Sequence, residues 1–414
     1  MFKRVEATNY RLLKSVGQDL AHFNILIGPN ASGKSTFFDV LSFIRDFATR
    51  DARYAVDMRV ESSFDELTHM RQGGAVKFTV EVALPDDVRE KSGAEFTRYT
   101  VEFAANESRQ SNGSSEAIEN GTAQVVHESL SLHDRDGSRR TVADRDYLEE
   151  EFRKGWHAKL TREFDRNELS EWDVLHVKMR QDVSILSTIV DAANQPAAMF
   201  TREYLMEGVQ LMMLDTNRIT QPVRRAQSTD RLASDGSNFA WVLKRLWDSQ
   251  DRSSNFGDWL LHVRSVLRNL EDVRPFEYGD RSLGFEVRFS GFAEDKYAPA
   301  TALSDGTLRF LALTILPYLP QAMQTYLIEE PENGIHPKAI QAIYQSLTSV
   351  YDGQVLLATH SPVLLNLAKP SELLCFSRNG DGATEIVSGD RHPNLRTWQG
   401  ELELSELFAA GVLG

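Results

Sequence analysis

A glycine-rich segment near the N-terminus constrains this chain more than any other feature. Residues 28–35 read GPNASGKS and match G-x-x-x-x-G-K-[ST] at every fixed position. The apolar run 23–27 before them predicts a short buried strand, and apolar residues at three-to-four spacing after them predict a helix from about Gly33. A strand, such a loop and a helix in this order are typical of a P-loop that binds nucleotide phosphates.

The residue types in this loop predict how ATP would be held. Its backbone N–H groups and the N-terminus of the following helix would face the phosphates. We expect Lys34 to reach the β- and γ-phosphate oxygens and the Ser35 hydroxyl to coordinate Mg²⁺. The alternative is a solvated glycine turn that fits the pattern by chance. The other loop residues expected to contact ATP are Gly28, Asn30, Gly33 and Thr36.

Length and composition limit the class of protein. The chain has 414 residues, more than one ordinary domain, which favours a core with an insertion or a second lobe. Its single cysteine, Cys375, cannot form an internal disulfide, and no C-x-x-C spacing indicates zinc. No apolar run approaches the ~18 residues that cross a bilayer, so we expect a cytoplasmic protein without membrane contact.

The net charge of −14 disfavours a uniformly basic surface for nucleic acid. Arginine clusters such as Arg139-Arg140, Arg218 and Arg224-Arg225 could still meet phosphates locally, so direct DNA contact stays open. The alternative is that these clusters are ordinary solvated faces.

Hydrophobic periodicity predicts strands first and an insertion afterwards. Alternating apolar residues in 76–84 and 96–103 predict half-buried antiparallel strands. The Asn-, Ser- and Gly-rich segment 104–122 predicts a loop at the edge of an insertion. A hairpin turning at Asp136-Gly137 follows, and the charged, turn-poor composition from 144 to about 200 predicts helices.

From about Tyr204 the chain returns to apolar runs that alternate with helical stretches, which predicts a layered α/β core. We therefore expect 1–104 and 204–414 to form one head around a common sheet, interrupted by an insertion at 105–203. The predicted strands lie at 209–216, 283–289, 325–330 and 354–362, and the predicted helices at about 239–249, 256–270, 307–323 and 338–350.

Three later motifs add catalytic chemistry to the loop: LSDGTLRF at 303–310, TYLIEEPENGIHP at 325–337 and VLLATHSP at 355–362. ATP hydrolysis needs a held Mg²⁺, an oriented water and neutralised γ-phosphate charge. We expect Glu329 to hold Mg²⁺, Glu330 to act on the attacking water and His360 to contact the γ-phosphate or that water. The alternatives are that Glu329 and Glu330 are ordinary surface charges and that His360 is a histidine with satisfied hydrogen bonds in the core. Ser304 in the first of these motifs could be an ordinary helix N-cap.

These motifs, with SDGSNFAWVLKRL at 234–246, resemble the ABC-type ATPases of the RecF, SMC and OLD group. They are most similar to the stand-alone bacterial AAA family ATPases that carry ENGxHP and THSP. The resemblance covers roughly 1–104 and 204–414. It implies an α/β, ABC-type P-loop ATPase head with an antiparallel β subdomain, and the composition of 105–203 adds a mainly helical insertion.

The resemblance also implies a homodimer in which two heads sandwich two ATP molecules. Ser304 and Gly306 of one subunit would contact the γ-phosphate bound to Lys34 of the other. Gln72 lies where the group has its Q-loop, a residue that senses Mg²⁺ and the γ-phosphate. Residues 332–337 occupy the D-loop position, with His336 as a candidate contact to the second subunit.

Two departures from the family pattern bear on activity. Glu329 stands where Asp is usual, and Asp305 replaces a glycine of the transporter-type signature. The longer Glu329 side chain could alter metal geometry, so slow or partner-dependent hydrolysis is expected.

The preferred functional hypothesis is the ATPase and sensor half of a two-component anti-phage or toxin-type system. Its effector would be encoded separately, for example a Toprim-like or HNH nuclease, as in Septu- and PARIS-like systems. Only 52 residues follow Pro362, so no nuclease activity is expected in this chain. The alternatives are a RecF-like repair ATPase that binds DNA directly and a housekeeping signalling ATPase.

Overall fold

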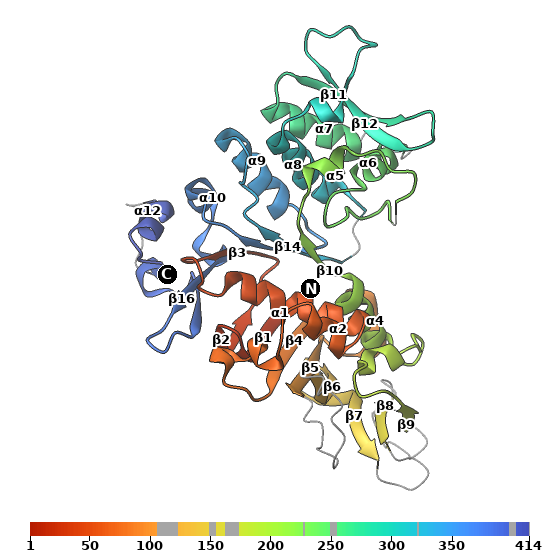
Figure 1. Cartoon of the computed structure of the whole chain (residues 1–414), viewed down its shortest axis with the longest axis vertical. Helices are drawn as coiled ribbons and strands as arrows, with labels where there is room; N and C mark the ends of the chain where they lie inside the picture. Colours follow the sequence, from red (N-terminus) through yellow and green to blue (C-terminus); the bar gives the residue numbers. More distant parts are fainter. Residues whose placement is uncertain are drawn as a thin grey trace. The chain divides into compact units, whose positions relative to one another are not determined.

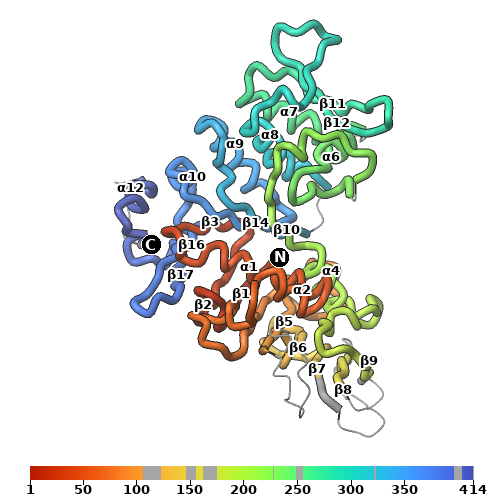
Figure 2. The backbone as a smooth tube through the Cα atoms, viewed as in Figure 1, coloured from red at the N-terminus to blue at the C-terminus, as the bar shows by residue number. Residues whose placement is uncertain are grey.

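The structure is a computed structural model, and two compact units make up the chain (Figure 1). Unit 1 comprises 1–21, 29–209 and 376–386, and unit 2 comprises 22–28, 210–375 and 387–414. Each unit therefore combines segments that are far apart in sequence, as the backbone trace in Figure 2 shows by colour. The structure describes residues 1–105, 123–148, 155–161, 174–226, 228–248, 255–320, 323–396 and 403–413.

Unit 1 is built on an eight-stranded antiparallel sheet with the order β2-β1-β4-β5-β6-β7-β8-β9. From β4 onward each strand pairs with the next in sequence, so hairpins account for most of the sheet. The predicted strands at 76–84 and 96–103 and the turn at Asp136-Gly137 are confirmed. The strands are β1 Phe2–Tyr10, β2 Leu13–Asp19, β4 Val76–Ala83, β5 Phe96–Ala105, β6 Ala123–His133, β7 Arg139–Leu148, β8 Gly155–Thr161 and β9 Val174–Lys178.

Helix α1 packs aromatic side chains against this sheet. Its Phe43 ring lies 5.2 Å from Phe78 and 5.0 Å from Phe103, and Phe47 lies 4.9 Å from Phe103, measured between ring centroids. The helix starts at Lys34 directly after Gly33, as predicted. The helices of unit 1 are α1 Lys34–Thr49, α2 Ala52–Asp57, α3 Asp86–Ser92 and α4 Pro196–Glu207, with 3₁₀ turns at Phe64–Leu67, His69–Arg71 and Ile185–Thr188.

The expectation of helices between 144 and about 200 is wrong for most of the described residues. Strands β7, β8 and β9 extend the sheet, and α4 starts only at Pro196. In β8, Ala158 and Leu160 are buried while Lys159 is exposed, which is the alternation of a strand on a half-covered sheet. The charged composition of this segment does not show the alternation clearly in the sequence. Its conformation as a strand is determined by pairing with β7. Of the predicted loop at 104–122, residues 104 and 105 belong to β5, and 106–122 lie outside the described residues.

A buried ion pair crosses the centre of the unit 1 sheet. Glu128 on β6 and Arg145 on β7 lie 2.7 Å apart, and both side chains are 0% exposed. Glu128 also accepts hydrogen bonds from the Tyr99 hydroxyl at 2.6 Å and the Ser184 hydroxyl at 2.5 Å. Burial, followed by the Glu128 charge, raises the pKa of Tyr99. Arg145 donates to the carbonyl oxygen of Gln181 at 3.1 Å, so the network fixes 181–185 to the sheet.

Unit 2 contains a six-stranded sheet with the order β10-β14-β15-β3-β16-β17, of which β14, β15, β3 and β16 run parallel. Residues 376–386, which comprise the end of the fifth strand in this order, the turn and the start of the sixth, are counted with unit 1. The bodies of β3 and β15 are buried throughout, as in sheets covered on both faces. The strands are β3 Phe23–Ile27, β10 Val209–Met212, β14 Thr325–Glu329, β15 Gln354–Ala358, β16 Leu373–Arg378 and β17 Thr384–Ser388.

The helices of unit 2 alternate with its strands, close to the ranges predicted from periodicity. Helix α8 packs on α9, and α10 packs on α9 and α12. A three-stranded sheet of β11 Leu270–Glu277, β12 Leu283–Phe289 and β13 Ala298–Pro299 packs on α6 and α7. The helices are α5 Thr216–Thr220, α6 Phe239–Asp248, α7 Asn255–Val266, α8 Asp305–Thr314, α9 Pro337–Thr348, α10 Pro362–Leu367, α11 Pro393–Arg396 and α12 Leu404–Ala409, with 3₁₀ turns at Ala300–Ala302, Leu316–Tyr318 and Pro370–Glu372.

Candidate nucleotide site

Three motifs follow parallel strands of unit 2 and therefore begin at the same edge of its sheet. Glu329 pairs with Ala358, and Ala358 pairs with Leu26. The glycine-rich loop starts after β3, the paired glutamates end β14, and Thr359-His360 follow β15. Carboxyl ends of strands in open α/β sheets are the usual place for ligand sites.

The loop after β3 has the backbone of a phosphate-binding turn. Gly28, Ala31 and Gly33 have positive φ angles of 150°, 59° and 107°. A Cβ on Gly33 would lie 2.4 Å from the Thr384 hydroxyl, which itself donates to the carbonyl oxygen of Ser32 at 2.8 Å. Thr384 therefore supports the loop, although it lies 352 residues from Ser32 in the sequence. Its role was not predicted from the sequence.

The side chains of the loop suit an ATP–Mg²⁺ complex. Lys34 is 9% exposed, and its ammonium donates to the carbonyl oxygen of Pro29 at 3.0 Å, which curls it over the loop. Asn30 and Ser35 are exposed, and Thr36 is half-buried. Within the described residues no three His, Cys, Asp or Glu side chains form a metal cage. Mg²⁺ in nucleotide sites typically takes only one or two protein oxygens plus phosphate oxygens, so Ser35 and an acidic residue would suffice.

The two glutamates after β14 differ in their surroundings. Glu329 is exposed at the end of the strand. Glu330 has a positive φ of 46°, unusual for a residue with a side chain, while its N–H still bonds to the carbonyl oxygen of Ala358 at 2.8 Å. The side-chain amide of Asn333 donates to Glu330 Oε2 at 2.5 Å. Backbone strain of this kind is concentrated at functional sites.

A third glutamate in the same motif links two of these loops. Glu332 Oε1 accepts from the Thr359 hydroxyl at 2.6 Å and from the N–H of His360 at 3.2 Å. The His360 ring is half-buried, with its centroid 6.2 Å from that of Phe408. Sequence reasoning assigned no role to Glu332 beyond its place in the D-loop motif, because the contact depends on the order of β14 and β15.

The start of α8 lies against the loop that carries Glu330. Ser304 is exposed and caps α8 by accepting from the N–H of Thr307 at 3.3 Å. It is therefore a helix N-cap, as the alternative interpretation of the sequence expected. A Cβ on Gly306 would lie 2.1 Å from the carbonyl oxygen of Gly334, which leaves room only for glycine. Arg309 donates to the carbonyl oxygen of Asn333 at 3.1 Å.

Comparison with known proteins shows the family of the chain. Residues 23–366 match the family described as "AAA domain, putative AbiEii toxin, Type IV TA system". The chain belongs to this AAA-domain family. Its fold is similar to that of a solved SMC head.

Solved SMC heads give the structural comparison. A crystal structure of the SmcHead bound to the C-winged helix domain of ScpA has a TM-score of 0.52 at 14% identity, covering 93% of this chain and 96% of that one. An SMC head with an extended coiled coil, bound to the C-terminal domain of ScpA derived from Pyrococcus furiosus, gives 0.48 at 13%, covering 99% and 98%. The Thermotoga maritima SMC head domain gives 0.42 at 10%, covering 94% and 98%.

The AAA-domain motifs divide between the two units. Gly28, the paired glutamates, His360 and the start of α8 belong to unit 2, where hydrogen bonds and close packing connect the last three. The loop from Pro29 through Ser35 belongs to unit 1, as does Gln72, which lies on an exposed turn before β4. His336 caps α9 by accepting from the N–H of Lys338 at 3.2 Å and is exposed.

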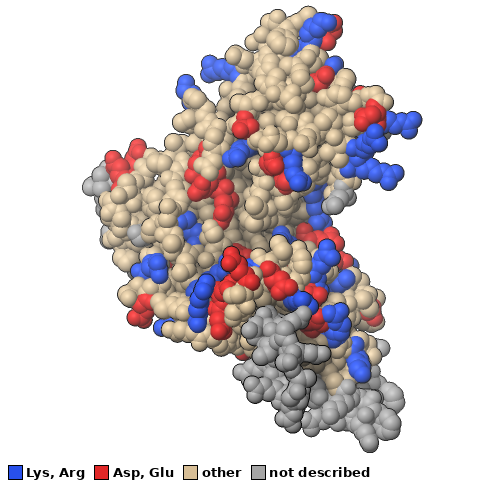
Figure 3. Space-filling model, in the orientation of Figure 1, with Lys and Arg blue, Asp and Glu red and all other residues tan. Residues whose placement is uncertain are grey.

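The arginine clusters noted in the sequence are largely neutralised by carboxylates. Arg140 bonds to Asp134 at 3.0 Å, and Arg224 pairs with Asp280 at 3.3 Å. Acidic and basic side chains are interspersed over much of the face shown in Figure 3. None of the helices in the described part of this AAA-domain protein has the length and apolar composition that a bilayer crossing requires.

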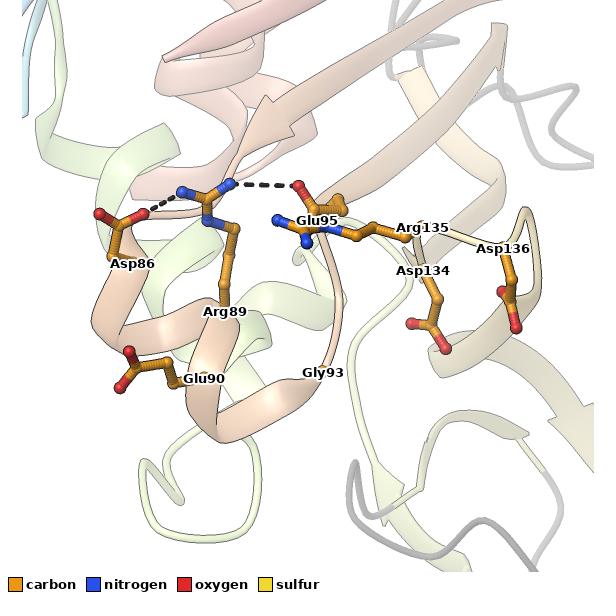
Figure 4. A pocket seen from close by; sticks show the side chains of 8 residues that line it. All are labelled: Asp86, Arg89, Glu90, Gly93, Glu95, Asp134, Arg135 and Asp136. Carbon is orange, nitrogen blue, oxygen red and sulfur yellow. Dashed lines mark hydrogen bonds and ion pairs between the residues drawn. The ribbon is translucent and has the colours of Figure 1, made fainter.

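Unit 1 also has an open cavity of about 520 Å³ between α3 and the turn that joins β6 to β7 (Figure 4). The arginines that line it form ion pairs with nearby carboxylates. Arg89 pairs with Asp86 and with Glu95, and Arg135 donates to Glu95 at 2.6 Å. The hydrogen bond from Arg135 lowers the pKa of Glu95. No AAA-domain motif lines this cavity. The lining residues are Asp86, Arg89, Glu90, Gly93, Glu95, Asp134, Arg135 and Asp136.

Proposed function

We propose that this AAA-domain protein is a Mg²⁺-dependent ATPase. The observation that carries the proposal is the common sheet edge at which the glycine-rich loop, Glu330 and His360 follow β3, β14 and β15. The residues proposed to bind phosphate, activate water and contact the γ-phosphate belong to the segments that follow these three strands.

Each side chain has a distinct role in the proposed reaction. Lys34 binds β- and γ-phosphate oxygens, and Ser35 and Glu329 supply oxygens for Mg²⁺, with Gln72 as a further contact. The bound metal neutralises phosphate charge. Glu330 takes the proton of the attacking water, because its carboxylate is exposed and oriented through Asn333. His360 donates to the γ-phosphate side of the site.

The proposed active form is a homodimer closed around ATP. Exposed Ser304 and half-buried Gly306 lie at the N-terminus of α8, where helix N–H groups and the helix dipole attract anions. In a second copy they would meet the γ-phosphate held by Lys34 of the first.

We place this ATPase in the cytoplasm as the sensor half of a two-component defence or toxin-type system. The family description, which names a toxin, supports that context. The effector would be a separate chain, such as a Toprim-like or HNH nuclease. Pairing of Arg140 and Arg224 with carboxylates counts against a RecF-like protein that clamps DNA by itself.

Phosphate release and fluorescent-ATP binding by the purified chain test the ATPase. Wild type should release phosphate only with Mg²⁺, and Lys34→Ala should lose ATP binding because the phosphates lose their charge partner. Lys296→Ala, an exposed lysine of unit 2, is the matched control. Unchanged ATP affinity in Lys34→Ala would contradict the role of the loop.

Light scattering tests the dimer. With ATP, the Glu330→Gln chain should double in mass, and the added substitution Ser304→Arg should prevent this while leaving ATP bound. Ser265→Arg, on the exposed surface of α7, is the control. Dimers that persist in Ser304→Arg would contradict the sandwich.

Co-purification tests the cellular role. The chain is expressed with its flanking genes and recovered in the presence of ATP, and stoichiometric partners are identified by mass spectrometry. A nuclease or toxin partner is expected. ATP turnover stimulated by DNA, with steep salt dependence and no protein partner, would favour the repair-type ATPase instead.

A further inference from the structure

We propose that Glu332 is a positioning residue that holds His360 relative to Glu330; the inference rests on the proposed ATPase function. Glu332 leaves the loop after β14 and reaches the loop after β15. Its Oε1 accepts from the Thr359 hydroxyl at 2.6 Å and from the N–H of His360 at 3.2 Å. The carboxylate therefore fixes both the backbone of His360 and the residue before it.

The position of this bond in the sheet gives it its importance. The backbone ladder between β14 and β15 ends with the bond from Glu330 N–H to the carbonyl oxygen of Ala358. Beyond that point Glu332 supplies the link between the two loops. Thr359 is fully buried, and its N–H bonds to the carbonyl oxygen of Leu26 at 3.3 Å, two residues before the glycine-rich loop. One threonine thus connects the ends of three strands.

The opposite side of the same loop contacts α8. Asn333 bonds to the Glu330 carboxylate through its side chain and to Arg309 through its backbone. Gly334 lies against Gly306 with no space for a side chain. A displacement of α8 would therefore be transmitted to Glu330 directly and to His360 through Glu332.

The second oxygen of Glu332 argues against a purely structural role. Oε2 is buried and has no hydrogen-bond partner, which is costly for a carboxylate. Glu128 in unit 1 is a buried carboxylate with a structural role, and both of its oxygens accept hydrogen bonds. A carboxylate selected only for stability would be expected to satisfy both oxygens in the same way.

Steady-state ATP turnover of the full chain tests the inference. Thr359→Val keeps the shape and removes the donor, and Glu332→Ala removes the acceptor. Each should lower kcat about tenfold with KM for ATP within about twofold, because a misplaced His360 affects the reaction more than ground-state binding. Thr359→Ser should keep near wild-type kcat, since the hydroxyl is retained.

The fall in kcat with KM unchanged is the readout that a purely structural role would not produce, and a double-mutant cycle tests whether the two changes act through the same interaction. Glu332→Ala combined with Thr359→Val should lower kcat by clearly less than the product of the two single effects, because both changes remove the hydrogen bond from the Thr359 hydroxyl to Glu332. The bond from the His360 N–H is lost only in Glu332→Ala, and the bond from the Ser361 N–H to the Thr359 hydroxyl is lost only in Thr359→Val. Thr348→Val, which removes a hydroxyl bonded to the carbonyl oxygen of Tyr344 within α9, is the matched control and should retain wild-type turnover. Melting curves verify folding, and Thr359→Val decides the question if Glu332→Ala does not fold.

Two results would overturn the inference separately from the proposed function. Wild-type kcat in Thr359→Val would overturn it while ATP hydrolysis stands. Multiplicative losses in the double variant, about a hundredfold, would do the same. A wild-type chain that releases no phosphate would instead overturn the proposed function and this inference together.

Discussion

The two large sheets of this chain use carboxylates in opposite ways. In the antiparallel sheet of unit 1, Glu128 is fully buried and each oxygen is bonded to neighbouring groups. At the edge of the parallel sheet of unit 2, Glu329 is exposed as the last residue of β14, and Glu330 is exposed directly after it. The first arrangement stabilises a fold, and the second leaves charge available for a ligand.

This difference follows from where each sheet can accommodate polar groups. Successive hairpins in unit 1 bring side chains of adjacent strands together, so a buried charge finds partners across the sheet. Parallel strands covered on both faces have apolar bodies, and their polar residues gather at the strand ends. Substitutions in unit 1 should therefore change stability, and substitutions at the strand ends of unit 2 should change chemistry.

The largest effect is expected for Glu330→Gln, which replaces the proposed base by an amide that cannot accept the proton. Turnover should fall by about 10²- to 10⁴-fold with ATP still bound, measured as phosphate release beside fluorescent-ATP titration. Glu277→Gln, an exposed carboxylate at the end of β11, is the control. Turnover retained in Glu330→Gln would mean that the base lies elsewhere.

Arg145→Met tests the structural side of the comparison. It leaves Glu128 buried without its cation, so the free energy of unfolding should fall by about 3–5 kcal/mol in denaturant titration. ATP affinity of the folded fraction should be unchanged. Arg135→Met, at an 82% exposed side chain, should alter stability by no more than about 0.5 kcal/mol. Equal effects of the two substitutions would contradict the assigned role of the ion pair.

Gly306→Ala tests the contact between α8 and the loop after β14. The added methyl group has no space beside the carbonyl oxygen of Gly334, so stability should fall by about 1–3 kcal/mol and ATP turnover should fall as the loop shifts. Gly279→Ala, where a Cβ would meet no neighbour, is the matched control. Unaltered turnover in Gly306→Ala would show that the contact between α8 and this loop does not affect ATP hydrolysis.

The smallest effect concerns the apolar body of the parallel sheet. Burial raises the pKa of Cys375 on β16 from its ordinary value of 9.0 to about 12. An unfolded thiol ionises from about pH 9, so the contribution of Cys375 favours the native state below that pH and is lost as the pH rises toward 12. Iodoacetamide at pH 8 should label the native chain far more slowly than the unfolded chain. Rapid native labelling would show that this part of the sheet opens to solvent.

Sequence predicted the features that depend on local order. The loop, the glutamates after β14 and the histidine after β15 could be placed because each follows a short apolar strand. Glu332 and Thr384 were missed, because their contacts join residues that are distant along the chain. The strands β8 and β9 were mistaken for helix, since a charged segment shows little periodicity until a neighbouring strand provides its partner.

The strand order also has a consequence for how the protein is made. Phe23 of β3 pairs with Val355 of β15, whereas the strands from β4 to β7 pair with near neighbours in sequence. As the ribosome produces the chain from its N-terminus, those hairpins can form early, but β3 has to wait for most of the polypeptide. A nascent chain should therefore gain nucleotide binding late, after residue 358 has emerged, so prematurely terminated products would carry the loop without its support.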